Sequence, residues 1–166
     1  MDLAMPRLTC RRVALVCLLV SLAACGQRRP DPVSAGLYPG ETLVMRRLVS
    51  QYAAVHEIPP SLLHRVIQRE SDYRADARNG PYYGLMQILP QTAATMGYDG
   101  PASGLLDAET NLRWAGAYLR GAWIVADGDE AEAVRWYASG YYYEARDRCL
   151  LVETGLRPRE VRRNCA

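Results

Sequence analysis

Apolar side chains recur at helical spacing just before position 70. Leu63, Val66 and Ile67 fall on one face of a predicted helix, and Glu70 continues the same face. A carboxylate that faces a core is costly unless it is paired, hydrogen-bonded or protonated. Because an apolar surround raises the pKa of a carboxyl group, Glu70 is a candidate general acid near neutral pH. The alternative is an ordinary Glu at a helix end, paired with a neighbouring Arg.

The same periodicity predicts five further helices, and no stretch alternates as a strand would. One begins near Glu41 and one opens at Pro90; two follow the candidate N-caps Asp107 and Asp129, and a last one covers 141–156. The faces expected to be apolar are Val44, Met45, Leu48, Val49 and Tyr52 in the first of these helices, and Leu112, Ala115, Gly116, Leu119, Ala122 and Trp123 in the one after Asp107. The fold is therefore predicted to be mainly α.

Residues 1–24 have the pattern of a targeting segment. Three arginines precede the uncharged run 13–24, which is too short to span a bilayer comfortably. The run ends in Leu-Ala-Ala-Cys-Gly, which resembles the bacterial lipobox and implies lipidation of Cys25; the alternative is a plain signal peptide with an incidental cysteine. Residues 25–40 would then tether a domain that is lipid-anchored and faces the periplasm, at the outer membrane because Gly26 follows the cysteine.

Composition allows one domain with a sizeable core, since 49% of the 166 residues are hydrophobic. The formal net charge is +2, and the segment 1–24 carries three Arg and one Asp, so the remainder is formally neutral. Charge therefore gives no reason to expect a nucleic-acid partner. His56 and His64 are the only histidines and have no acidic or thiol neighbours at metal-ligand spacing, so we expect no metal and no cofactor.

Four short motifs occur in order along the chain. They are Glu70-Ser71, then Gly84-Leu85-Met86-Gln87, then Asn111-Leu112 with Gly116-Ala117-Tyr118-Leu119, and last Trp136-Tyr137-Ala138-Ser139-Gly140. Together, over roughly residues 41–155, they resemble the soluble lytic transglycosylase family. The resemblance implies a lysozyme-like helical domain, here 41–156, whose partner is the glycan strand of peptidoglycan.

The resemblance also implies a mechanism. Glu70 would act as general acid on the glycosidic oxygen between N-acetylmuramic acid and N-acetylglucosamine, and then as general base on the muramic C6 hydroxyl. The muramic acetamido group would assist in between, and the product would carry a 1,6-anhydro end. A second catalytic carboxylate, which most glycosidases need, is then not required. Asp72 and Asp76 are interpreted as solvated loop residues.

Substrate contacts are implied for the motif after the loop and for the last motif. Gly84 would let the backbone approach the glycan, Met86 would offer a soft apolar contact, and Gln87 would offer a donor and an acceptor. The hydroxyl of Tyr137 would hydrogen-bond Glu70 and orient it.

The chain departs from the family pattern at two places. Ala138 stands where the family has Asn, and the loop before Gly84 is slightly shorter than usual. In that loop Asn79 is expected to be the polar partner near the acid, and Tyr82 and Tyr83 are candidates to stack on sugar faces. The lost Asn also favours a rival function, a peptidoglycan-binding envelope lipoprotein without turnover. A second rival, a hydrolysing muramidase on the same fold, lacks an obvious second carboxylate.

Two cysteines remain beyond the targeting segment and Cys25. In an oxidising periplasm, Cys149 and Cys165 are predicted to form a disulfide; the alternative is one buried cysteine and one frayed terminus. The residues 157–166 form a basic tail, which is interpreted as a solvated terminus.

Overall fold

The computed structural model describes residues 36–165, so the predicted signal segment and Cys25 lie outside the described residues. The elements, in chain order, are α1 (Leu43–Val55), α2 (Pro60–Ser71), β1 (Arg78–Asn79), β2 (Tyr82–Tyr83), α3 (Pro90–Thr95), the 3₁₀ helix η1 (Ala102–Leu106), α4 (Ala108–Val125), α5 (Glu130–Ser139) and α6 (Tyr142–Asp147). The mainly α fold predicted from the sequence is confirmed.

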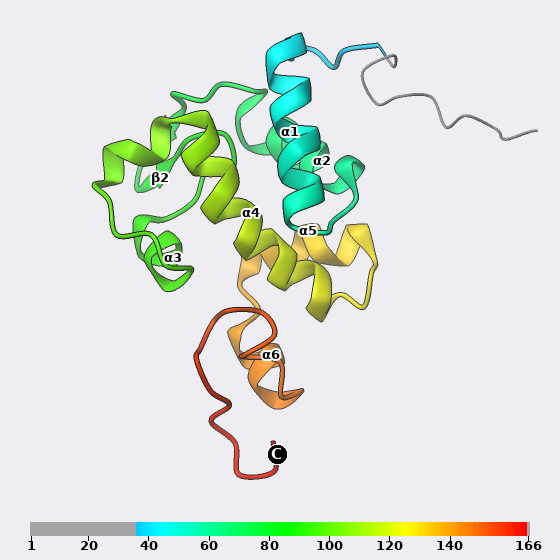
Figure 1. Ribbon diagram of the computed structural model, residues 1–166, viewed down its shortest axis with the longest axis vertical. Coiled ribbons are helices and arrows are strands. Elements are labelled where there is room, and N and C mark those ends of the chain that lie inside the picture. Colours follow the sequence, from blue (N-terminus) through cyan, green and yellow to red (C-terminus); the bar gives the residue numbers. More distant parts are fainter. Residues whose placement is uncertain (1–35, 166) are drawn as a thin grey trace, which may run out of the picture.

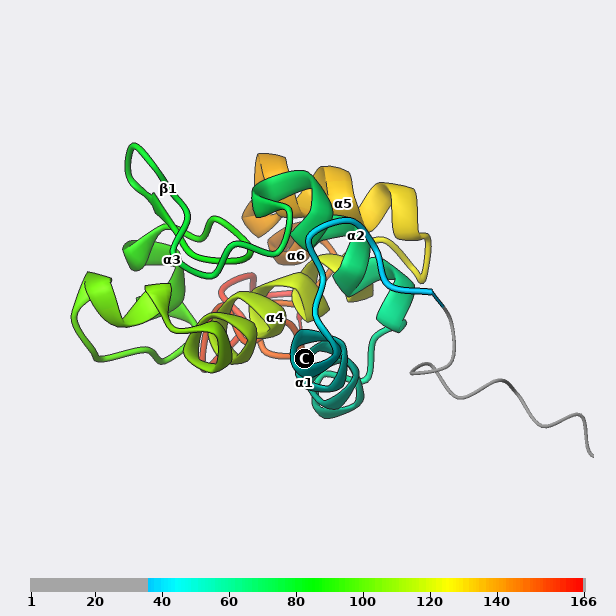
Figure 2. The same ribbon diagram turned by 90° about the horizontal axis from the view of Figure 1, so that it is seen from above.

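The long helix α4 lies at the centre of the molecule, as Figure 1 shows. In the view of Figure 1, helices α1, α2 and α5 lie to one side of it, and the β-hairpin and α3 lie to the other. Seen from above in Figure 2, α1 lies on one side of α4, whereas α2, α5 and β1 lie on the other. Helix α6 and the C-terminal segment occupy one end of the long axis. Helix α2, which carries Glu70, and the hairpin thus lie on the same side of the central helix in the view of Figure 2.

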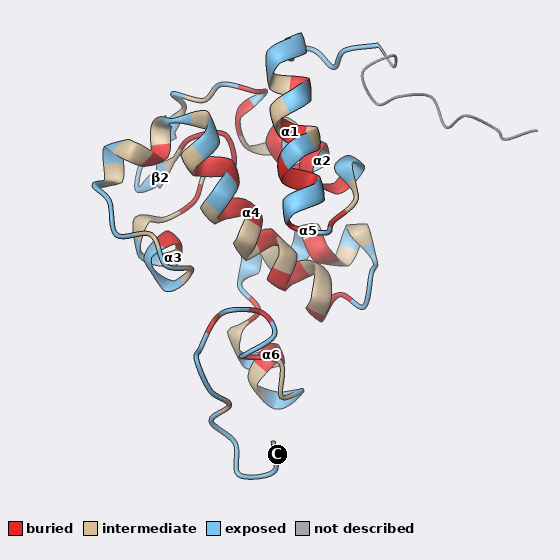
Figure 3. Ribbon diagram, viewed as in Figure 1, coloured by how far each residue is buried: buried red, intermediate tan, exposed pale blue. Residues whose placement is uncertain are grey.

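The caps of α4 and α5 are those expected from the sequence. The Asp107 carboxylate accepts a hydrogen bond from the Thr110 N–H at 2.8 Å, and the Asp129 carboxylate accepts one from the Glu132 N–H at 2.8 Å. Each satisfies a backbone donor that the first helical turn leaves unpaired. On α4 the predicted apolar face is buried, with Trp123 partly buried beside it, and its residues form the red segments that recur along α4 in Figure 3.

Helix α1 packs most of the expected face inward, since Val49 and Tyr52 are buried and Met45 and Leu48 pack against the core, but it differs at two positions. Val44 is 73% exposed, whereas Val49 and the charged Arg46 are buried. The Arg46 guanidinium makes a two-pronged ion pair with the buried carboxylate of Glu41. Because this pairing draws the Arg46 side chain into the interior, the buried stripe begins at Arg46 rather than at Val44.

The last helix is much shorter than expected, because α6 ends at Asp147. Cys149 has a left-handed backbone, φ 59°, and the Leu150 N–H donates to the Ala145 carbonyl at 2.7 Å. A left-handed residue with such a six-to-one bond closes a helix in a Schellman motif. The loop before Gly84 also differs from the expectation, since it contains the short antiparallel hairpin β1–β2.

Candidate active site

Glu70 lies in the last turn of α2, beside the buried face formed by Leu63, Val66 and Ile67. Its side chain is 23% exposed, and the nearest cationic atom is Nε of Arg69, 3.5 Å from Oε1. Partial burial raises the pKa of the Glu70 carboxyl, and the Arg69 charge opposes that rise. The net direction is upward, as a general acid that works near neutral pH requires.

Two adjoining hollows open on either side of the Glu70 carboxyl. One, of about 330 Å³, is lined by Arg69, Glu70, Asn79, Tyr82, Gln87, Tyr137 and Ala138. The other, of about 300 Å³, is lined by Glu70, Arg74, Ala77, Arg78, Asn79 and Gln87. Glu70 is the only carboxylate among the described residues that line the two. Asp72 and Asp76 are exposed and stand outside both linings.

The wall opposite α2 is the turn 84–87, and a buried amide holds it in place. Oδ1 of Asn111 accepts from the Met86 N–H at 2.9 Å, and Nδ2 donates to the carbonyls of Tyr83 and Leu105 at 2.9 and 2.8 Å. Gly84 has φ +77°, and a Cβ there would lie 2.2 Å from Asn111 Nδ2 and from the Leu105 carbonyl oxygen. This position therefore requires glycine for packing as well as for its backbone.

Ser71 connects this wall to α2, the helix that carries Glu70. Its buried hydroxyl donates to the Leu85 carbonyl at 2.8 Å, so the residue after Glu70 is bonded to the turn that faces Glu70. Neither Ser71 nor Asn111 was assigned a role from the sequence, although both stand in the quoted motifs. Their places in those motifs were the available signal, because both stand among polar neighbours in the sequence.

Gln87 is the member of this turn that reaches the hollows. Both N–H bonds of its amide have partners, the carbonyls of Ala77 at 3.1 Å and Gly84 at 2.9 Å. The amide oxygen is therefore the group that remains for a ligand, and it can accept from a hydroxyl or an acetamido N–H.

Two other residues of the motif have packing positions instead. The Met86 side chain is 0% exposed and belongs to the core, and Gly84 is buried against Asn111. Contacts from these two to a glycan, as expected from the sequence, are not available in this structure. In a tight turn only some residues can face outward, and Gln87 takes that position.

The two tyrosines of the hairpin also differ from each other. Tyr82 is 42% exposed and lines the larger hollow, whereas Tyr83 is half-buried, with the Arg78 guanidinium 4.7 Å from its ring centroid. Neighbouring residues of a strand point to opposite faces, so only one of the pair can line the hollow. Of the predicted contacts, Glu70, Asn79, Gln87 and Tyr137 come together, and Tyr83 does not join them.

Tyr137 lines the same hollow, but its hydroxyl has a different partner from the one expected. It donates to the Met86 carbonyl at 2.8 Å rather than to Glu70. Burial raises the pKa of Tyr137 well above its ordinary value, and the nearby charge of Glu70 adds to that rise. The phenol is thus a permanent donor that fixes the turn, while its ring forms part of the wall beside Glu70.

No group of three or more His, Cys, Asp or Glu side chains between residues 36 and 165 is placed to hold a metal ion. Both histidines are buried, and Nε2 of His56 bonds the Leu112 carbonyl at 2.9 Å. Within the same range, no helix is long and apolar enough to cross a membrane.

Comparison with known families agrees with this geometry. The model of the transglycosylase SLT domain matches residues 47–147, more than half of the chain, and the chain belongs to this family. No solved structure matches the chain. The family places the protein among transglycosylase-type enzymes that act on peptidoglycan in the cell envelope.

Proposed function

We propose that this protein is a lytic transglycosylase that cleaves the bond between N-acetylmuramic acid and N-acetylglucosamine and leaves a 1,6-anhydro end. One observation carries the proposal: Glu70, with its raised pKa, is the only carboxylate among the described residues lining the hollows around it. Hydrolysing glycosidases commonly need two carboxylates. A single carboxyl suits a reaction in which the substrate's own acetamido and C6 hydroxyl groups act in place of the second carboxylate and water.

The proposed steps use one proton on one side chain. Protonated Glu70 donates its proton to the glycosidic oxygen while the bond between that oxygen and the muramic C1 breaks. The acetamido oxygen forms a new bond to C1 at the same time. The Glu70 carboxylate then removes the proton from the C6 hydroxyl, whose oxygen displaces the acetamido oxygen at C1. Glu70 ends protonated again, so the cycle needs no further proton donor.

The remaining lining groups would bind and orient the sugars. The Gln87 amide oxygen and the Asn79 side chain supply polar contacts on both sides of Glu70, since both residues line both hollows. The exposed ring of Tyr82 supplies a flat apolar surface for a sugar face.

The sequence further supports an envelope location in which Cys25 carries a lipid anchor. We propose that the anchor lies in the outer membrane and that the domain faces the periplasm. Metabolic labelling with a fatty-acid analogue tests this, because Cys25→Ser should abolish the label and release the protein from the membrane fraction.

The product mass tests the reaction. The domain starting at Gln27 is incubated with purified peptidoglycan, beside its Glu70→Gln variant. Muropeptides lighter by one water than hydrolysis products, absent with Glu70→Gln, are the expected result. Full-mass reducing ends would instead indicate a muramidase.

One observation favours a second candidate, a glycan-binding lipoprotein. Ala138 lines the Glu70 hollow at the position where the family has Asn, so one polar contact to substrate is missing. Binding to peptidoglycan without release of any product, equal in the parent and in Glu70→Gln, would support this candidate and exclude the enzyme.

A further inference from the structure

The hollow that contains Glu70 continues into a longer groove. A hollow of about 200 Å³ shares Tyr82, Gln87, Tyr137 and Ala138 with it. A further hollow, of about 480 Å³, shares Thr92 and Tyr118 with that one. Adjoining hollows with common walls form one path, so the surface around Glu70 extends well beyond the scissile bond.

The far hollow is built partly by residues outside the family match. Its lining consists of Gln91, Thr92, Thr95, Tyr118, Tyr142, Leu156, Arg157 and Pro158. The last three follow residue 147, where the match ends. This part of the groove therefore belongs to the C-terminal segment of this particular chain.

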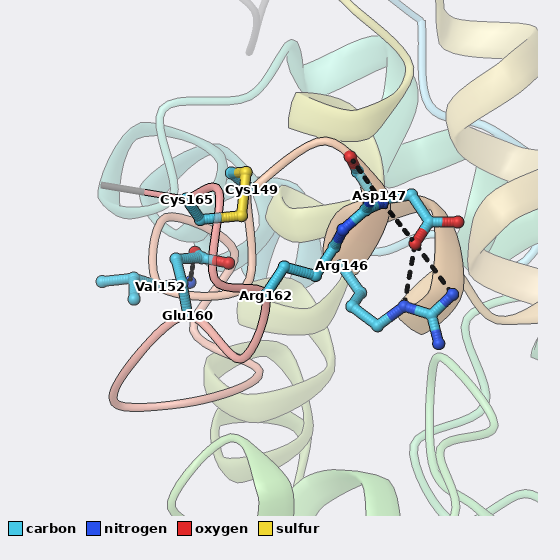
Figure 4. The surroundings of a disulfide bond; sticks show 7 residues. All are labelled: Arg146, Asp147, Cys149, Val152, Glu160, Arg162 and Cys165. Atoms are coloured by element: carbon cyan, nitrogen blue, oxygen red, sulfur yellow. Dashed lines mark hydrogen bonds and ion pairs between the residues drawn. A yellow bond between two sulfur atoms is a disulfide. The ribbon is translucent and has the colours of Figure 1, made fainter.

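The C-terminal segment is largely exposed, as expected for a solvated terminus, but it is tied to α6. A disulfide joins Cys149 and Cys165, whose Cα atoms are 5.4 Å apart. Nη1 of Arg162 lies 3.0 Å from the Asp147 carboxylate, and Glu160 accepts from the Val152 N–H at 2.8 Å. Figure 4 shows these bonds around the disulfide.

Arg157 itself has a fixed backbone and an available charge. Its N–H donates to the Leu151 carbonyl at 3.1 Å, and the preceding Leu156 is buried. The guanidinium lies 5.7 Å from the ring centroid of Tyr142. No carboxylate between residues 36 and 165 forms an ion pair with it, in contrast to Arg162. A cation held beside an aromatic ring at the edge of a hollow is suited to a planar anion such as a carboxylate.

We propose that the far hollow is a distal subsite of the glycan groove, in which Arg157 pairs with a carboxylate carried by the bound strand. This inference rests on the proposed function, because it takes peptidoglycan as the ligand. Two parts of that polymer supply the chemistry: the lactyl group of a muramic acid without peptide, and the carboxylates of a stem peptide. Arg157 would thus make the protein distinguish carboxylate-bearing strands from neutral N-acetylglucosamine oligomers.

The test compares Arg157→Ala with Arg159→Ala, an exposed arginine of the same segment that does not line the hollow. Binding is measured in the Glu70→Gln background to three ligands: peptide-bearing strands, peptide-free strands, and N-acetylglucosamine oligomers. Arg157→Ala should weaken binding to carboxylate-bearing strands about fivefold and leave the neutral oligomers unchanged. If Arg157→Ala weakens binding to the peptide-bearing strands alone, the carboxylate belongs to the stem peptide. If it weakens binding to the peptide-free strands alone, the carboxylate belongs to the lactyl group.

The subsite is wrong if Arg157→Ala binds all three ligands equally more weakly, or if it binds them as tightly as its parent does. It is also wrong if Arg159→Ala shows the same weakening as Arg157→Ala. Muropeptide release by the parent is measured separately. If release fails while the ligand-selective loss persists, the proposed reaction is wrong and the subsite stands. If release proceeds and the selective loss is absent, the reaction stands and the subsite is wrong.

Discussion

Two carboxylates beside arginines have opposite environments in this molecule. Glu41 is buried, and Arg46 donates hydrogen bonds to both of its carboxylate oxygens. The Tyr38 N–H also donates to this carboxylate, at 3.0 Å. Glu70 is partly exposed and has only Arg69, 3.5 Å away and itself half in solvent. Burial raises the pKa of each carboxyl, but at Glu41 the hydrogen bonds from Arg46 and Tyr38 more than reverse the rise.

The comparison shows that partner geometry, rather than burial, decides what a carboxyl group can do. Glu41 stays ionised and ties α1 to α2, since its Oε1 also lies 3.7 Å from Nδ1 of His64. Glu70 lacks such partners, so the effect of burial prevails and its pKa is raised. A stability role and a chemical role thus follow from the number of donors around each carboxylate.

The largest expected effect is on turnover. Glu70→Gln should lower muropeptide release by about 10⁴-fold, because one side chain performs both proton transfers. Its thermal stability should not fall, since the amide removes a partly buried charge. Residual release above about a hundredth of the parent rate would rule out Glu70 as the acid.

The matching substitution at the other carboxylate should act on stability instead. Glu41→Gln removes the buried carboxylate to which two nitrogens of Arg46 bind, and it should lower the free energy of unfolding by about 3 kcal/mol. Denaturant unfolding measures this, and release per folded molecule should be kept. Glu57→Gln is the control. The Glu57 side chain is 79% exposed, and its ion pair with Arg120 is long, at 3.7 Å. The free energy of unfolding should therefore change by less than about 1 kcal/mol.

The pH dependence of the free energy of unfolding under acidic conditions tests the ionised state of Glu41. Because the folded-state pKa of Glu41 lies below its ordinary value of 4.5, its contribution is complete above that value and is lost as pH falls through the folded pKa. The stability difference between the parent and Glu41→Gln should therefore shrink below about pH 4.5. A difference that is constant with pH in denaturant unfolding would contradict the ionised pair.

A smaller effect is expected at the wall of the groove. Tyr137→Phe removes the donor to the Met86 carbonyl and should lower the free energy of unfolding by about 1 kcal/mol. Because the hydroxyl does not bond Glu70, the pH dependence of kcat/KM should keep its shape. A shifted pH profile with unchanged stability would show instead that the hydroxyl acts on the acid.

The smallest effect is a shift of pH dependence. Arg69→Ala removes the positive charge that lowers the pKa of Glu70, so that pKa should rise. Activity requires the protonated acid and is lost as pH rises through this pKa, so the alkaline limb of kcat/KM should move to higher pH. Arg65→Ala, an exposed arginine on the same helix, should leave the limb in place.

Several features followed from the sequence because they depend on residues a few positions apart. The caps Asp107 and Asp129 bond backbone within three residues, and the spacing of Leu63, Val66 and Glu70 is fixed by the helical repeat. Gln87 and Tyr137, singled out from the sequence motifs, line the same hollow as Glu70.

Other features were decided only by the tertiary structure, because they depend on residues far apart in the chain. Met86 and Gly84 turn inward because Asn111, on α4, holds their turn. The inward turn of Arg46 depends on Glu41 and its surroundings, and Arg157 lines the groove because its segment is bonded back onto α6. Periodicity and local capping carry no information about such contacts. The sequence determined most of the helices and the place of Glu70 on one of them, and long-range packing decided which side chains surround its carboxyl group.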